Sequence, residues 1–181
     1  LLQRLIRRVL EGPGRLIVVA WLIDDGGAPD AITPASERPE ENRWLYAVAG
    51  GATEGKPHRL PDHLGRIPLG IGPIGRIAVT QQSVVINDLD KDPGDLAAIQ
   101  DWLKEEQIRG FLGVPIVHRG EVLGVAAAFD HANVPDEAPT WGRLFADHVA
   151  GAVANARAFE EIERLKTQLE QQNAYLREAV V

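Results

Sequence analysis

The chain has 181 residues, of which 45% are hydrophobic and 25% are charged, and its formal net charge is −7. This composition is typical of one globular domain with room for an appendage. The acidic balance disfavours direct DNA binding, and the absence of cysteine excludes thiolate catalysis, thiol-linked cofactors and cysteine-ligated metals. We see no membrane-spanning run and no signal peptide, so we expect a cytoplasmic protein without membrane contact. Since the chain lacks an initiator methionine, we expect it to be part of a longer protein.

The N-terminal half predicts one helix and two strands. Apolar residues recur at helical spacing over residues 1–11, and Gly12-Pro13-Gly14 ends this helix. The runs RLIVVAWLI (15–23) and RWLYAVA (43–49) predict strands on either side of a Gly- and Pro-rich surface loop over residues 24–42. Residues 57–68 contain three prolines and are predicted to be irregular.

The C-terminal half predicts a short strand, a helix, a hairpin and a long terminal helix. The strand is Val84–Ile86, and the helix covers residues 95–107 with Asp95 as its N-cap. Two apolar runs, 111–118 and 121–129, flank Arg119-Gly120 as in a β-hairpin. The order of elements predicts an α+β fold: a central antiparallel sheet with the terminal helices on one face and loops and short helices on the other.

The long helix from Pro139 onward carries two apolar stripes that are out of phase between Phe159 and Ile162. The first is predicted to pack on the sheet and comprises Phe145, Val149, Ala152, Ala156 and Phe159. The second is typical of a short coiled-coil seam in a homodimer held through its terminal helices, and comprises Ile162, Leu165, Leu169, Gln172, Leu176 and Ala179. We therefore predict a globular domain over residues 1–158 and a coiled-coil extension over residues 159–181.

A Gly-x-Gly-x-x-Gly spacing at Gly70, Gly72 and Gly75 invites a comparison with dinucleotide-binding loops. Such a loop follows a buried strand, whereas PDHLGRIPL precedes these glycines, and Pro73 removes a backbone N–H that could bind phosphate. We therefore interpret the segment as the start of a short helix, with Pro73 in its first turn. A dinucleotide-dependent enzyme remains the alternative hypothesis.

No arrangement of residues typical of catalysis is present. Asp88, Asp90 and Asp92 have the spacing of calcium ligands, but they lack the glycine and glutamate of an EF-hand loop. The five histidines show neither a zinc-binding pair nor a neighbouring nucleophile. We expect that the chain is not an enzyme and has no metal centre, with the three acids as the remaining metal-binding possibility.

Three segments together resemble a GAF domain, the small-molecule-sensing module of many regulators. They are IGRIAVTQQSVVIND (74–88), the predicted hairpin from Phe111 to Val125, and FADHVA (145–150) with Ala154-Asn155-Ala156. The tail FEEIERLKTQLEQQNAYLRE (159–178) is similar to the linker that joins a GAF sensor to the ATPase domain in sigma-54-dependent transcriptional activators of the formate-hydrogenlyase-activator type.

This resemblance implies a GAF-like fold and a regulatory role. It implies a ligand held between the sheet and the middle segments by Arg76, Ile86, Asp88, Trp102 and Phe111. Ligand occupancy would then be passed through the tail, by Ile162, Leu165, Leu169 and Leu176, to a C-terminal effector domain. The ligand and any cofactor are unknown. Bilin-binding members of the family attach the pigment through cysteine, so the absence of cysteine disfavours a covalently attached bilin. The alternatives are a ligand-free dimerisation spacer and the sensory domain of a histidine kinase or nucleotide cyclase.

Overall fold

Two long apolar strands form the centre of a six-stranded sheet in which all neighbouring strands are antiparallel. The computed structural model describes residues 1–12, 14–24, 43–53 and 60–180. The loop predicted over residues 24–42 lies, from residue 25 onward, outside this part of the chain. The strand order is β3-β2-β1-β6-β5-β4. The strands are β1 Leu16–Ile23, β2 Trp44–Ala52, β3 Arg66–Pro68, β4 Val84–Ile86, β5 Gly110–His118 and β6 Glu121–Asp130.

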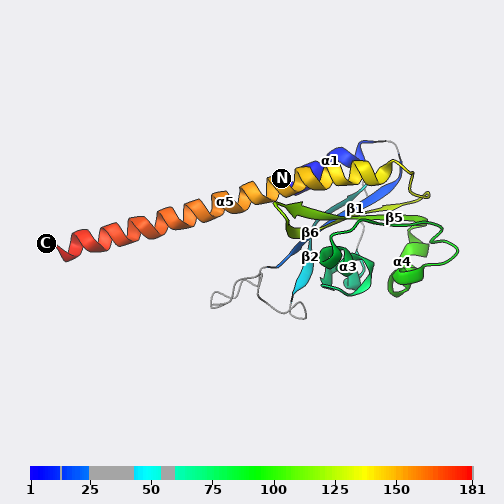
Figure 1. Ribbon diagram of the computed structural model, residues 1–181, viewed down its shortest axis with the longest axis horizontal. Helices are drawn as coiled ribbons and strands as arrows, with labels where there is room; N and C mark the ends of the chain where they lie inside the picture. Colours follow the sequence, from blue (N-terminus) through cyan, green and yellow to red (C-terminus); the bar gives the residue numbers. More distant parts are fainter. Residues whose placement is uncertain (13, 25–42, 54–59, 181) are drawn as a thin grey trace.

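The helices form one layer on each face of the sheet (Figure 1). One face is covered by α1 (Leu2–Leu10) and by α5 (Ala138–Ala179). The other face carries α2 (Asp62–Gly65), α3 (Gly72–Thr80), the 3₁₀ helix η3 (Gly94–Ile99) and α4 (Gln100–Glu105). The predicted α+β fold, with its terminal helices on one face, is confirmed.

Side-chain alternation along β1 divides the interior into two apolar layers. Ile17, Val19 and Trp21 belong to the layer that also contains residues of α3 and α4, whereas Val18 and Ala20 lie with residues of α1. The sheet is therefore apolar on both faces, which is why both need a covering layer. Among the described helices, none is long and apolar enough to cross a membrane.

The segment between β4 and β5 differs from its prediction as one capped helix. It forms η3 and then α4, and Asp95 is not the N-cap. The carboxylate of Asp95 instead pairs with the guanidinium of Arg76 in α3. Asp92 satisfies the first turn, because its Oδ1 accepts a hydrogen bond from the N–H of Gly94 at 2.9 Å. Residues 60–68, predicted to be irregular, contain α2 and β3, whose lengths of four and three residues leave little periodic signal.

The glycine-rich segment before α3 is explained by backbone geometry. Gly70 and Gly72 have φ values of 81° and 66°, in the left-handed region that favours glycine. A Cβ at Gly75 would lie 2.4 Å from the carbonyl oxygen of Pro68. Since α3 begins at Gly72 with Pro73 in its first turn, the interpretation as a helix start is confirmed.

The long helix α5 packs on the sheet only near its N-terminal end. Its buried residues are Ala146, Val149, Ala150 and Val153, which lie against apolar residues of β5 and β6. From residue 158 to residue 180 every side chain is exposed, and Figure 1 shows this part projecting from the body. The stripe predicted to pack on the sheet is therefore partly wrong: Val149 is buried, but Ala156 and Phe159 are exposed, because the helix has left the sheet before it reaches them.

We predict that Trp21→Phe lowers the free energy of unfolding by about 1–3 kcal/mol. Trp21 is fully buried, and its indole N–H donates to the carbonyl of Leu64 in α2 at 2.5 Å. The substitution keeps a ring but leaves that carbonyl unpaired. Urea unfolding measures the change. As a control, Trp44→Phe should cost about 1 kcal/mol or less, because its half-buried ring is replaced by one that still stacks under Arg66. Equal losses in the two variants would contradict the role of the Trp21 hydrogen bond.

Candidate functional site

Three aromatic side chains meet in the layer between the sheet and α4. The ring of Phe129 on β6 lies 5.0 Å from the ring of Trp102, edge to face, and 5.3 Å from that of Phe111 on β5. Trp102 is 8% exposed, and the two phenylalanines are fully buried. Such contacts add about 0.5–1.5 kcal/mol each beyond the burial of area. These three residues are called the aromatic cluster below.

The indole N–H of Trp102 is unusual within this cluster. Over the described ranges, it is the one buried side-chain nitrogen or oxygen without a hydrogen-bond partner. A buried donor without an acceptor costs about 1–3 kcal/mol. By contrast, the indole of Trp21, which is fully buried, donates to a carbonyl. An unpaired donor at the edge of an apolar cluster is suited to an acceptor atom brought by a ligand.

The structure groups three of the five predicted ligand residues and places the other two apart. Trp102 and Phe111 belong to the same core, and Ile86 packs against it. Arg76 and Asp88 have half-exposed side chains and bind other partners: Arg76 pairs with Asp95, and Asp88 with Lys91. The two charged residues therefore lie at the surface, not in the aromatic cluster.

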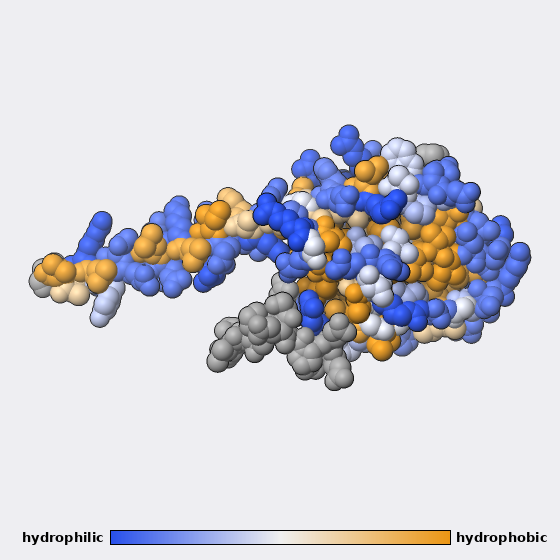
Figure 2. Space-filling view, in the orientation of Figure 1, coloured by the Kyte–Doolittle hydropathy of each residue, from blue (hydrophilic) through white to orange (hydrophobic). Residues whose placement is uncertain are grey.

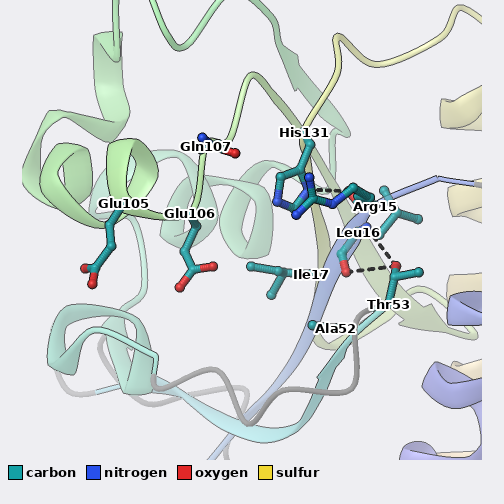
Figure 3. A pocket seen from close by; sticks show the side chains of 9 residues that line it. All are labelled: Arg15, Leu16, Ile17, Ala52, Thr53, Glu105, Glu106, Gln107 and His131. Atoms are coloured by element: carbon teal, nitrogen blue, oxygen red, sulfur yellow. Dashed lines mark hydrogen bonds between the residues drawn. The ribbon is translucent and has the colours of Figure 1, made fainter.

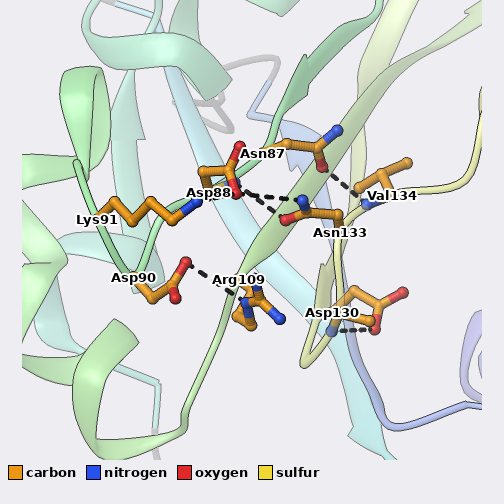
Figure 4. A network of polar contacts seen from close by, with 9 residues as sticks. Asn87, Asp88, Asp90, Lys91, Arg109, Asp130, Asn133 and Val134 are labelled. Carbon is orange, nitrogen blue, oxygen red and sulfur yellow. Dashed lines mark hydrogen bonds and ion pairs between the residues drawn. The ribbon is translucent and has the colours of Figure 1, made fainter.

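Asp88 belongs to a set of hydrogen bonds that joins the end of β4 to the loop before α5 (Figure 4). The Oδ1 of Asn87 accepts a hydrogen bond from the N–H of Val134 at 2.7 Å. The N–H of Asp88 donates to Oδ1 of Asn133 at 3.0 Å, and Nδ2 of Asn133 donates to the carboxylate of Asp88 at 3.3 Å. We call these four residues the β4–α5 clamp. It fixes the segment that leads to η3 against the segment that leads to α5.

The acids once considered for metal binding have other partners. Asp88 and Asp90 form ion pairs with Lys91 and Arg109 at 3.3 and 3.4 Å, and Asp92 accepts the hydrogen bond from Gly94. Hydrogen bonding from Asn133, and then from Lys91, lowers the pKa of Asp88 below its ordinary value. Nowhere in ranges 1–12, 14–24, 43–53 and 60–180 do three acidic or histidine side chains gather as metal ligands.

A small cavity of about 90 Å³ opens between the start of β1, the end of β2 and the end of α4 (Figure 3). Ile17, which pairs with Phe129 in the sheet, forms part of its wall together with Glu106, the residue that directly follows α4. Arg15 and His131 lie on another side, where Nδ1 of His131 is 2.6 Å from the carbonyl oxygen of Arg15. The volume of this cavity is well below the roughly 300–1,000 Å³ of sites that bind drug-sized ligands.

The sequence prediction missed the residues whose roles depend on the tertiary fold. Phe129 was identified as a strand residue but not as the centre of an aromatic cluster. Asn133 contacts Asp88 across 45 positions of sequence, and His131 contacts Arg15 across 116. No local pattern in a single sequence marks such pairs. The pairing of β1 with β6 brings His131 to Arg15, and the pairing of β5 with both β4 and β6 brings Asn133 to Asp88.

Solved structures with the same fold include two GAF domains. One is the GAF domain region of a Geobacter sulfurreducens protein, with a TM-score of 0.63 and 18% identity, covering 84% of this chain and 90% of that one. Another is the GAF domain of a phosphoenolpyruvate-protein phosphotransferase from Coxiella burnetii, with a TM-score of 0.61 and 22% identity, covering 88% and 84%.

The expectation that the chain is not an enzyme is contradicted by a third similarity. The type II free methionine-R-sulfoxide reductase from Thermoplasma acidophilum has a TM-score of 0.60 and 18% identity, covering 85% of this chain and 90% of that one. Other free methionine-R-sulfoxide reductases also share the fold, at 14% and 21% identity. Enzymes and sensors therefore use the same architecture, so the architecture does not exclude catalysis.

No curated protein matches this sequence. A sequence profile of the GAF domain matches residues 1–154, which is most of the chain. The match starts at the first residue and ends where α5 leaves the sheet, so it includes both faces of the sheet described above. The chain belongs to the GAF domain family, which supplies sensory and regulatory domains to signalling proteins.

Proposed function

We propose that this chain is a small-molecule-sensing and dimerisation domain that passes its ligand state through α5 to an effector domain. The observation that carries the proposal is the continuity of α5. One uninterrupted helix of 42 residues packs on the sheet through Ala146–Val153 and is fully exposed from residue 158 to Ala179. A shift of its packed end therefore moves its free end as well.

The proposed context is a cytoplasmic bacterial transcriptional regulator of the sigma-54-dependent activator type. The resemblance of residues 159–178 to the linker of such activators supports this context. In it, Ile162, Leu165, Leu169 and Leu176 would pair with the same residues of a second copy. Histidine kinases and nucleotide cyclases are alternative contexts for the same sensor. The dense filling around Phe129 favours a second candidate function, a ligand-free dimerisation spacer.

The proposed ligand site is centred on Trp102, with Phe111 and Ile86 as its apolar walls. A matching ligand combines an apolar body with an oxygen that accepts the unpaired indole hydrogen bond. Trp102, Phe111 and Ile86 do not line the cavity beside Ile17 and Glu106, so ligand entry would require a movement of the short helix α4. Arg76 and Asp88 lie at the surface of the same layer, where charged groups of a larger ligand would reach them.

The β4–α5 clamp provides a route from this site to the exit helix. Residues 89–101 join Asp88 to Trp102, and residues 135–137 join the clamp to α5. A ligand that binds more tightly to one arrangement of α4 would shift the clamp and the start of α5 together. The size of the effect is limited by the ligand's preference for that arrangement.

We predict that Trp102→Phe weakens ligand binding about two- to tenfold, since one hydrogen bond to a buried indole contributes about 0.5–1.5 kcal/mol. Native mass spectrometry of the purified protein measures the fraction that carries a co-purifying small molecule. In the ligand-free protein the same change should alter the free energy of unfolding by less than about 1 kcal/mol, because it also removes an unpaired donor. Trp44→Phe is the control and should bind normally. Unchanged binding by Trp102→Phe would refute the proposed site, and a ligand-free wild-type protein would favour the spacer.

We also predict that Asp88→Asn destabilises the protein near pH 6 and that this destabilisation becomes smaller as the pH is lowered towards 2. Hydrogen bonds to its carboxylate lower the pKa of Asp88 in the folded state. Its stabilising effect is therefore complete above the unfolded pKa of about 3.9 and is lost as the pH falls through the folded value. Urea unfolding midpoints at the two pH values test this. Glu170→Gln, on the exposed part of α5, should show no such difference. A pH-independent loss in Asp88→Asn would contradict the role of the carboxylate.

A further inference from the structure

The cavity in Figure 3, called the β1–α4 cavity below, lies apart from the proposed ligand site. Its nine lining residues include none of Trp102, Phe111 and Ile86. Figure 2 shows hydrophilic side chains over the end of the body where α4 lies in Figure 1, whereas apolar side chains recur along the projecting part of α5. The β1–α4 cavity is therefore a separate feature with polar surroundings, and the proposed ligand site does not account for it.

Opposite walls of the β1–α4 cavity carry opposite charges. Glu105 and Glu106, at the end of α4, lie on one side, and Arg15 and His131 lie on the other (Figure 3). Ile17 lies between the two sides. A carboxylate binds an ammonium group, and a guanidinium binds a carboxylate, through strong charge-assisted hydrogen bonds. A molecule with one group of each kind matches both walls.

The walls are fixed by hydrogen bonds of the fold. The carbonyl oxygen of Arg15 can only accept, so Nδ1 of His131, 2.6 Å away, donates to it and sets the position of the imidazole ring. The hydroxyl of Thr53 accepts from the N–H of Leu16 at 2.8 Å and joins the end of β2 to the start of β1. The N–H of Glu106 donates to the carbonyl of Trp102 at 2.9 Å. Such a preformed site loses little entropy when a ligand binds.

The size and the apolar part of the cavity limit what it can hold. Ile17 is 2% exposed, and Ala52 is half-buried. The volume of about 90 Å³ is smaller than the cavity of about 150 Å³ that holds a benzene ring. The space suits the few heavy atoms that join an ammonium group to a carboxylate, with any larger side chain left at the opening.

We infer that the β1–α4 cavity is a second small-molecule site, which binds the ammonium and carboxylate groups of an α-amino acid. The ammonium group contacts Glu106, and the carboxylate contacts Arg15. An anion alone would meet two glutamates, and a cation alone would meet Arg15, whereas a zwitterion avoids both repulsions. This inference goes beyond the proposed function, whose ligand site is centred on Trp102.

The position of the cavity indicates what an amino acid bound there would influence. Glu106 directly follows α4, and His131 lies two residues before Asn133 of the β4–α5 clamp. An amino acid that bridges the two walls would hold α4 and the clamp in one arrangement. It would thereby change the affinity of the site at Trp102, and a ligand at Trp102 would change the affinity for the amino acid by the same factor.

A titration followed by nuclear magnetic resonance tests the ligand class. L-Alanine is the probe, and propionate and ethylamine are matched controls that lack the amine and the carboxylate. We expect saturable shifts in the backbone signals of Thr53, Gln107 and His131, with a dissociation constant of about 1 mM or lower for L-alanine. Each control should bind at least tenfold more weakly. Because the two backbone charges carry the recognition, absence of saturation by L-alanine, or equal binding of either control, would overturn the inference.

Charge-neutralising variants test the two walls. Glu106→Gln and Arg15→Gln should each raise the dissociation constant of L-alanine at least tenfold. Asp101→Asn on α4 and Arg143→Gln on α5, whose side chains do not line the cavity, should leave it unchanged. None of the four side chains is fully buried, so we expect folded variants, and circular dichroism with thermal unfolding checks this. Normal binding by both Glu106→Gln and Arg15→Gln would refute the assigned walls.

Trp102→Phe separates this inference from the proposed function. It should change the dissociation constant of L-alanine less than twofold, because the Trp102 side chain does not line the β1–α4 cavity. Weaker binding by Trp102→Phe together with normal binding by Glu106→Gln would place the amino acid in the aromatic cluster. That result would overturn the second site and leave the proposed function intact. Saturable L-alanine binding by a protein that carries no ligand at Trp102 would support the second site alone.

Discussion

The packing of α5 on β5 and β6 is the contact on which the rest of this structure depends. The small side chains of Ala146 and Ala150 let the helix lie close to the sheet, and Val149 and Val153 pack in the same cluster. This contact uses one side of the helix and thereby leaves the other side exposed along its full length. It also fixes the direction in which the tail leaves the body. Both the sensor hypothesis and the dimer surface follow from that division of one helix into two faces.

Periodicity in the sequence predicted the elements that have a strong local pattern of apolar residues. The hairpin of β5 and β6 and the long helix α5 have strong local patterns, and their predictions are confirmed. The predicted helix over residues 95–107 was altered by its surroundings, because Asp92 forms the first hydrogen bond and Asp95 pairs with α3. Residue type alone indicated that aspartate would satisfy a helix start, but not which aspartate.

The candidate site was predictable in its apolar part and not in its polar part. Trp102, Phe111 and Ile86 lie in segments whose hydrophobicity marks them as core, and they meet there. The partners of Asp88 and the unpaired indole N–H depend on where distant loops end. Asn133 reaches Asp88 only because β6 runs antiparallel to β5, which in turn pairs with β4. The polar contacts of the site therefore follow from the order of the strands in the sheet, whereas the clustering of apolar residues helps to establish that order.

The same architecture occurs in sensors and in sulfoxide reductases, so function must lie in what differs between them. The sheet and its two covering layers provide a core closed on one side by short, separately attached elements such as α4. Such elements move at lower cost than the central strands, because few contacts hold them. Catalytic side chains can then lie beneath these short elements, or a movement of these elements can be transmitted to the rest of the chain. In this chain they are tied by the β4–α5 clamp to a helix with an unpaired apolar face, which is an arrangement suited to transmission.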